Sequence, residues 1–165
     1  MKYKKGDLLR EAKDYDFIIH GCNCFNTFGA GIALGIKQKY PQAHEQDLKT
    51  ISGDKNKLGT FTEYKYDEFT VINAYCQYGY GRIERGMTPK ESKLFREDAI
   101  RLSFRNIYEK YGNKDYKFAY PLLGSNLAGG KWERISKIIN EEMKDSDMTC
   151  IVWEKDKVNL NKFNL

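Results

Sequence analysis

Short apolar runs typical of buried strands alternate along this chain with segments of helical periodicity, and this alternation limits the folds that it can adopt. Residues 16–22 form an apolar run that ends in small residues, which predicts a buried strand. Residues 29–41 carry apolar side chains at helical spacing and end at Pro41, which predicts a helix. Such alternation is typical of α/β proteins. We therefore predict a three-layer α/β/α sandwich with a largely parallel or mixed central sheet.

The rest of the chain continues this pattern. The segments 58–66 and 68–76 are rich in β-forming residues and closely spaced, which predicts a hairpin. Further elements are predicted as a helix over 42–51, a strand over 116–123, a helix over 131–144 and a strand over 148–153. A polar tail follows the last strand.

The clearest helix start lies at residues 88–91. Thr88 can cap the helix, Pro89 suits the first helical position and Glu91 completes a capping box. The helix is predicted to continue to about residue 111 and to end at Gly112. The residues predicted to face a core from this helix are Phe95, Ala99, Leu102 and Ile107.

Length and composition indicate one soluble domain. The chain has 165 residues, so we expect a single domain over 1–165. Its net charge of +5 is mildly basic and suits a phosphate-bearing partner without requiring one. No apolar run approaches the roughly 20 residues of a membrane span, and the first 16 residues lack a signal-peptide core. We expect a monomeric, cytoplasmic protein with no membrane partner.

The cysteine and histidine pattern does not favour a metal site. His20, Cys22 and Cys24 lack the usual spacing of zinc ligands. We expect no metal and no cofactor, with the four cysteines as reduced, mostly buried thiols. His44 lies in a polar helical segment and is predicted to be a surface residue.

Two glycine-rich loops, 24–31 and 124–130, each follow a predicted strand and precede a predicted helix. Glycine allows a backbone to approach a ligand closely, and a helix N-terminus offers unpaired N–H groups and partial positive charge. Two such loops favour a diphosphate-binding site. Neither loop has the Walker spacing or the dinucleotide G-x-G-x-x-G spacing, so P-loop enzymes and Rossmann oxidoreductases are disfavoured.

Six motifs occur in the order and spacing of one known family. They are "KGDLL" (5–9), "IIHGCN" (18–23), "GAGIA" (29–33), "INAYCQYG" (72–79), "YPLLGSNLAGGKW" (120–132) and "IVW" (151–153). In these motifs the chain resembles a macro domain over nearly its whole length. It is most similar to the branch that holds phage and bacterial ADP-ribose-1''-phosphate-processing proteins, the yeast ADP-ribose-1''-phosphatase and terminal ADP-ribose glycohydrolases.

The resemblance implies the macro domain fold and a cleft for ADP-ribose. Asp7 would accept a hydrogen bond from the adenine amino group, and Trp153 would stack on the adenine. Asn23 would bind the distal ribose hydroxyls. The remaining residues implied to bind the ligand are Leu8, Cys22, Gly29, Ala30, Gly31, Ile32, Gly124, Ser125, Asn126, Leu127, Ala128 and Gly129.

The resemblance favours one activity, the hydrolysis of ADP-ribose 1''-phosphate to ADP-ribose and inorganic phosphate. His20 stands where the yeast-type phosphatase also has histidine, so His20 and Asn23 are the candidate catalytic residues. A histidine can act as a general acid, a general base or a nucleophile, and the sequence does not choose among these roles. A core histidine bonded to the backbone is the structural alternative.

Three other functions stay open. A glycohydrolase acting on ADP-ribosylated protein or nucleic acid is weakened, because its catalytic aspartate is replaced by Ala128 and no lysine lies within 73–76. A non-catalytic ADP-ribose reader remains possible if His20 is inert. An RNA-binding domain ranks last, because the basic segments mix both charge signs. The glycine-rich segment 77–87 is predicted to be either a loop that closes on the ligand or a plain surface loop.

Overall fold

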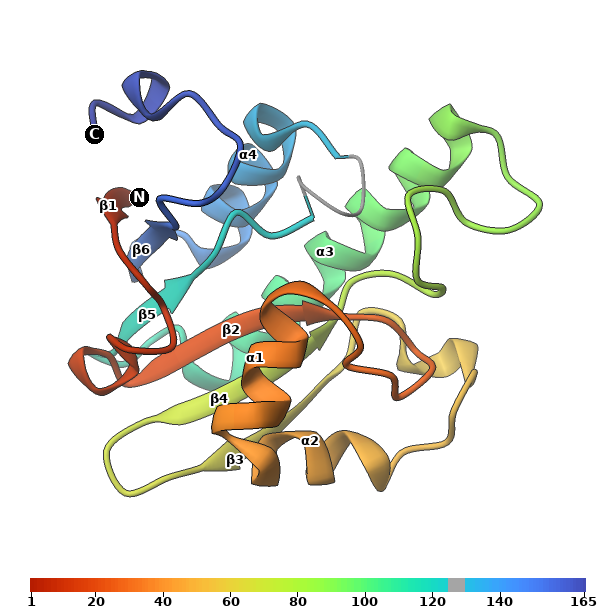
Figure 1. The fold of residues 1–165 in the computed structure, drawn as a ribbon, viewed down its shortest axis with the longest axis horizontal. Helices are drawn as coiled ribbons and strands as arrows, with labels where there is room; N and C mark the ends of the chain where they lie inside the picture. Colours follow the sequence, from red (N-terminus) through yellow and green to blue (C-terminus); the bar gives the residue numbers. More distant parts are fainter. Residues whose placement is uncertain (125–129) are drawn as a thin grey trace.

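The computed structural model describes residues 1–124 and 130–165, which form one mixed six-stranded sheet between two layers of helices (Figure 1). The strands are β1 (Lys2–Lys5), β2 (Phe17–Cys22), β3 (Phe61–Lys65), β4 (Thr70–Tyr75), β5 (Lys117–Tyr120) and β6 (Asp147–Val152). The α-helices are α1 (Gly31–Lys39), α2 (Pro41–Leu48), α3 (Pro89–Tyr111) and α4 (Trp132–Met143). Three short 3-10 turns are η1 (Ala12–Asp14), η2 (Lys55–Lys57) and η3 (Leu160–Phe163). The predicted α/β/α architecture is confirmed.

The strand order is β1-β6-β5-β2-β4-β3. Strands β1, β6, β5, β2 and β4 pair in parallel, and β3 runs antiparallel to β4, as the predicted hairpin requires. Parallel strands end at the same edge of a sheet. The loops that follow β1, β2, β4, β5 and β6 therefore leave the sheet on one side, at the carboxyl ends of these strands. We call this side the carboxyl edge.

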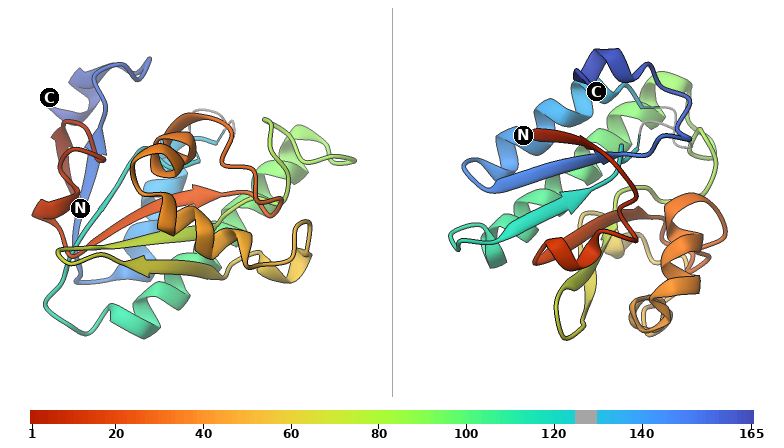
Figure 2. Two further views of the ribbon diagram at one scale, coloured as in Figure 1. Left: turned by 60° about the horizontal axis from the view of Figure 1, so that its bottom comes forward. Right: turned by 60° about the vertical axis from the view of Figure 1, so that its left-hand side comes forward.

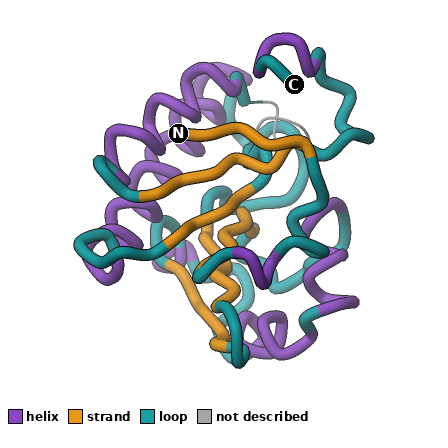
Figure 3. Tube along the Cα trace, turned by 90° about the vertical axis from the view of Figure 1, so that its left-hand side faces the viewer, coloured by secondary structure: helices purple, strands orange, loops and turns teal. Residues whose placement is uncertain are grey.

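Helices lie on both faces of the sheet (Figures 2 and 3). An apolar core fills the space between the sheet and the helices on each face. On one face, α3 and α4 pack through residues such as Phe104 and Ile139. On the other face, α1 and α2 pack through Ile36 and Ala43 onto alternate residues of β2 that include Ile18. Because side chains alternate along a strand, His20 faces the same side as Ile18, toward α1 and α2.

The predicted capping box of α3 is confirmed. Thr88 Oγ1 accepts from the Glu91 backbone N–H at 3.2 Å, and the Thr88 N–H donates to Glu91 Oε2 at 2.7 Å. The prediction that Leu102 faces the core is wrong, because its side chain is 44% exposed. The buried stripe of this helix runs through neighbours such as Phe104 and Ile107, and Leu102 lies outside it.

Two packed segments are absent from the sequence prediction. Strand β1 has the sequence KYKK and lies at the edge of the sheet. Edge strands often carry charged side chains, so β1 lacks the apolar alternation from which a strand is predicted. Its Tyr3 ring lies 4.9 Å from the ring of Phe163, which belongs to the segment predicted as a polar tail. The tail thus covers part of the core near β1. No helix among residues 1–124 and 130–165 is long and apolar enough to cross a membrane.

Candidate functional site

Four of the sequence-predicted site residues follow the carboxyl ends of parallel strands. Asp7 follows β1, Asn23 follows β2, Gly124 follows β5 and Trp153 follows β6. The topology brings these four positions, far apart in sequence, to one edge of the sheet. In open α/β sheets this edge is where ligands bind. Ser125, Asn126, Leu127, Ala128 and Gly129 lie outside the described residues.

The loop between β2 and α1 presents the N-terminus of α1 to solvent. Gly29, Ala30 and Gly31 are exposed, and no side chain of the described residues caps the helix at Ala30. Gly31 has φ of +56°, a conformation that glycine adopts without strain. The N–H groups of this turn are therefore open to an anion, and the helix dipole favours a negative charge there.

Asn23 is held inside this loop. Its Nδ2 donates to Thr27 Oγ1 at 2.8 Å, and its Oδ1 accepts from the Phe25 N–H at 2.8 Å. One N–H of Nδ2 and one lone pair of Oδ1 remain for a ribose hydroxyl, so the amide can bind it while keeping both contacts.

His20 lies beneath the loop and is 1% exposed. Its Nε2 is 2.6 Å from Asn73 Oδ1. The orientation of the Asn73 amide is fixed because Nδ2 donates to the Ala43 carbonyl at 2.8 Å, and a carbonyl only accepts. His20 Nε2 must therefore carry a proton and donate it to Asn73, which leaves the lone pair of the neutral ring on Nδ1.

Burial lowers the pKa of His20 from 6.5 to about 4, although the hydrogen bond with Asn73 acts in the opposite direction. The imidazole is therefore neutral at pH 7. The Cys22 Sγ lies 3.7 Å from Nδ1. Burial raises the pKa of the Cys22 thiol well above its usual range, so this thiol stays protonated and unreactive.

Phe28 separates the two histidines of the chain. Its ring meets His20 edge-on at 5.2 Å and lies 4.5 Å from the ring of His44. The prediction that His44 is a surface residue is wrong, because it is 8% exposed. The polar sequence of α2 does not reveal that a bulky side chain from another loop covers this histidine.

A chain of buried and half-buried polar side chains runs from Asn73 away from His20, and sequence reasoning missed it. Asn73 Nδ2 donates to Thr62 Oγ1 at 3.0 Å, which lies 3.1 Å from the Tyr75 hydroxyl. That hydroxyl donates to Asp47 Oδ1 at 2.6 Å. Lys57 Nζ lies 3.9 Å from the same carboxylate oxygen. The only sequence signal is the alternation of β4, which places Asn73 and Tyr75 on one face.

The residues proposed to meet the adenine have different surroundings. Asp7 Oδ1 accepts from the Leu9 N–H at 3.0 Å, so the carboxylate closes a turn and keeps its second oxygen toward Arg10. Leu8 is 4% exposed and belongs to the core. Trp153 is 45% exposed, which leaves a ring face available for stacking.

The two glycines at the ends of the second glycine-rich loop, Gly124 and Gly130, are hydrogen-bonded to each other. Gly124 has φ of +72°, and its carbonyl accepts from the Gly130 N–H at 2.9 Å. A Cβ on Gly130 would lie 2.6 Å from that carbonyl oxygen. Both glycines are therefore required by the closure of the loop.

Segment 77–87 is anchored by a buried ion pair. The Glu84 carboxylate accepts from the Tyr78 and Gly79 N–H groups at 2.8 Å each and from Arg96 Nε at 3.0 Å. Glu84 is 3% exposed, whereas Tyr80 at the tip is 71% exposed. Hydrogen bonds thus fix the segment at Tyr78, Gly79 and Glu84, whereas Tyr80 is exposed to solvent.

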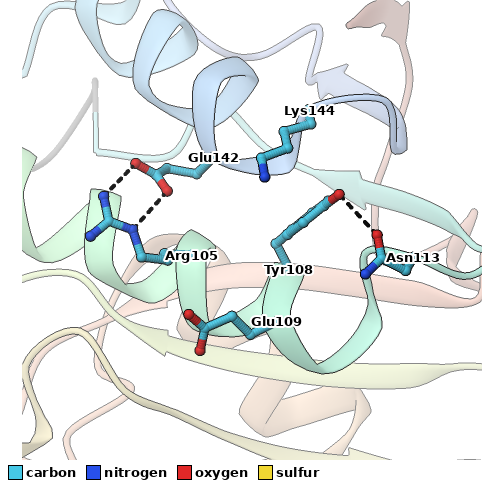
Figure 4. Close-up of a pocket in the computed structure, with 6 residues that line it drawn as sticks. All are labelled: Arg105, Tyr108, Glu109, Asn113, Glu142 and Lys144. Carbon is cyan, nitrogen blue, oxygen red and sulfur yellow. Dashed lines mark hydrogen bonds and ion pairs between the residues drawn. The ribbon is translucent and has the colours of Figure 1, made fainter.

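A polar hollow of ≈ 400 Å³ lies elsewhere, between the C-terminal parts of α3 and α4 (Figure 4). Arg105 closes one side through a bidentate pair with Glu142, with both distances at 3.0 Å. The hollow contains none of the sequence-predicted site residues. Among the residues that the structure describes, no three His, Cys, Asp or Glu side chains gather as metal ligands would.

Comparison with known proteins identifies the family. No family model matches the chain. An uncharacterised 17.5 kDa protein of Enterobacteria phage T4 is 31% identical over 158 residues, which cover 93% of this chain and 97% of that protein. The ADP-ribose 1''-phosphate phosphatase of Saccharomyces cerevisiae is 23% identical over 169 residues, covering 89% of this chain and 95% of the enzyme.

Solved structures agree with the observed fold. The macrodomain of Mycobacterium tuberculosis DarG superposes with a TM-score of 0.68 at 21% identity, covering 92% of this chain and 95% of that one. Thermosipho africanus DarTG, solved in complex with ADP-ribose, gives 0.72 at 14% identity, covering 98% of this chain and 43% of that one. A mixed sheet between helix layers is thus a shared architecture. The chain belongs to the macro domain family.

Proposed function

We propose that this protein binds ADP-ribose at the carboxyl edge of its sheet and hydrolyses ADP-ribose 1''-phosphate to ADP-ribose and inorganic phosphate. The observation that carries the proposal is the exposed N-terminus of α1, the next helix after the strand that holds His20, and no side chain of the described residues caps this terminus. Several relatives that match 86–92% of the chain are ADP-ribose 1''-phosphate phosphatases. These relatives, at 23–26% identity, support the proposed activity.

In the proposed complex the ligand spans the edge from β6 to β2. Trp153 stacks on the adenine, and Asp7 accepts from its amino group. The N–H groups of Gly29, Ala30, Gly31 and Ile32 bind the distal phosphate and ribose, and Gly124 lies beside the diphosphate. Cys22 lies at the end of β2, next to the proposed ligand, but its side chain is buried and makes no contact with the ligand in this proposal. The ligand is a small molecule or the ADP-ribosyl group of a modified macromolecule.

The proposed chemistry uses the lone pair of His20 Nδ1. With a pKa of about 4, His20 is a poor general acid at pH 7. Nδ1 would instead take a proton from an attacking water, or it would attack phosphorus and form an N–P bond that water then hydrolyses to inorganic phosphate. In either route the bond between phosphorus and the 1''-oxygen breaks, and this oxygen takes a proton from water and leaves as the hydroxyl of ADP-ribose. Because His20 is 1% exposed, substrate binding must displace the Phe28 ring or the Cys22 thiol.

The burial of His20 also favours a second candidate, a reader that binds ADP-ribose without chemistry. A neutral, hydrogen-bonded histidine in a covered position is what a purely structural role would produce. The two candidates share the binding site and differ only in whether His20 reaches the ligand.

The decisive experiment compares the parent protein with His20→Ala and His20→Gln variants. Each is incubated with ADP-ribose 1''-phosphate in the presence of a chelator, and inorganic phosphate is measured. Calorimetry checks ADP-ribose binding in all three proteins. Release by the parent and its loss in variants that still bind supports the phosphatase. A parent that binds ADP-ribose but releases no phosphate refutes it and supports the reader, with ADP-ribosylated protein as the next substrate to test.

A further inference from the structure

The loop between β2 and α1 holds Phe28 in a backbone conformation that this residue does not favour. Phe28 has φ of +39°, and Asn26 has φ of +59°, which asparagine tolerates. A bulky residue at positive φ is an outlier that persists only where its surroundings impose it. The loop therefore depends on contacts from other parts of the chain.

Lys57, at the end of η2, supplies such contacts from beneath. Its ammonium group donates to the Cys24 carbonyl at 3.1 Å and to Asn26 Oδ1 at 2.5 Å. The Asn26 amide is fixed in turn, because its Nδ2 donates to the Thr50 carbonyl at 3.0 Å. Lys57 is 6% exposed, although lysine is almost never buried unless it is paired.

The charge of Lys57 is balanced inside the protein. The Asp47 carboxylate, which is 0% exposed, lies 3.9 Å from Nζ, and the Tyr75 ring centroid lies 4.8 Å from it. Burial raises the pKa of Asp47, while the Tyr75 hydrogen bond and the Lys57 charge lower it. A buried ion pair adds little net stability compared with apolar residues of the same volume, so stability alone does not explain this one.

We propose that Lys57 is a positioning residue, whose buried ammonium holds residues 24–26 so that the N–H groups of 29–31 stay aimed at a bound phosphate. The inference rests on the proposed ADP-ribose site and adds a residue that none of its motifs contains. The ammonium acts through the loop and does not touch the ligand.

The test uses a charge-balanced double variant, Lys57→Met with Asp47→Asn. Removing Lys57 alone would leave the Asp47 charge buried and uncompensated, which would unfold part of the population. The double variant removes both charges, so it should keep the parent's melting temperature to within a few degrees. Lys49→Met, at an exposed lysine just after α2, is the matched control.

Two readouts separate positioning from folding. The first is the affinity for ADP-ribose, which should fall at least about tenfold in the double variant and stay unchanged in the control, because a hydrogen bond to a charged group is of that strength. The second is the amide NMR resonances of Gly29 and Gly31 without ligand, which should shift or broaden. Should the double variant fail to fold, both measurements are repeated on Asn26→Gly. This variant removes the amide that Lys57 contacts and keeps a residue suited to positive φ.

A folded double variant with parental affinity and unchanged Gly29 and Gly31 resonances would overturn the proposal. If the parent itself does not bind ADP-ribose, the proposed function fails. The positioning role is then decided by the amide resonances alone, and their movement supports it while their constancy refutes it.

Discussion

Acidification should destabilise this protein through His20 in a range where most carboxylates are still charged. His20 has a pKa of about 4 in the folded protein, below its ordinary value of 6.5. The unfolded chain therefore binds a proton at His20 before the folded protein does. The contribution of His20 to stability is fully present above pH 6.5 and is lost as the pH falls toward 4.

The size of the effect follows from the two pKa values. Between pH 7 and pH 5 the unfolded state gains about 0.7 of a proton at His20, and the folded state gains about 0.1. The free energy of unfolding should thus fall by about 2 kcal/mol from this group. Asp47 acts in the opposite direction, because its raised pKa makes protonation of the folded state easier.

Urea denaturation of the parent and of His20→Gln at pH 7, 6 and 5 isolates the histidine. Glutamine retains an N–H that can reach Asn73 but does not titrate, and Asp47 is present in both proteins. The free energy of unfolding should decline between pH 7 and 5 by about 2 kcal/mol more in the parent than in the variant. Equal pH dependence in the two proteins would show that His20 is not held neutral by burial, and the tautomer argument would fall with it.

Three further substitutions test other parts of the structure. Trp153→Ala should lower ADP-ribose affinity about 5- to 100-fold by calorimetry with little change in melting temperature, because the ring is 45% exposed; unchanged affinity would remove it from the site. Gly130→Ala should cost about 1–3 kcal/mol in thermal unfolding, since its Cβ would meet the Gly124 carbonyl oxygen at 2.6 Å. Gly29→Ala is the control, because a Cβ there would lie 3.9 Å from the nearest backbone atom. Equal losses of unfolding free energy in the two variants would contradict the conclusion that Gly130 is required for its contact with Gly124. Thr88→Ala should lower stability by about 1 kcal/mol through the lost cap of α3, and an unchanged melting temperature would argue against it.

The elements predicted correctly from sequence are those with local signals. The run 16–22 contains β2, and the Thr88 capping box starts α3 because its partners lie three residues apart. Strand β1 gives no such signal, since an edge strand exposes most of its side chains and needs no apolar alternation. Glycine-rich loops after strands of an α/β sheet also predict a binding edge, and that place of the site stays a prediction.

The environment of His20 was not predictable, because it depends on side chains distant in sequence. Asn73 is 53 residues from His20, and Phe28 reaches it only through a loop with a rare backbone conformation. Lys57 lies in a polar segment, whose sequence predicts exposure to solvent. It is buried because the Asp47 carboxylate of α2 balances its charge. Such contacts are created by the packing of α1 and α2 on the sheet and leave no periodicity in the sequence.

The burial of Glu84 changes the charge that the site edge presents to solution. The segment 77–87 contains one acidic residue, and Arg96 neutralises it inside the protein. The exposed charges of that segment are therefore those of Arg82 and Arg85. An anion diffusing toward the edge is attracted before it makes any contact, so ionic strength should govern how fast a phosphorylated ligand arrives more than how long it stays.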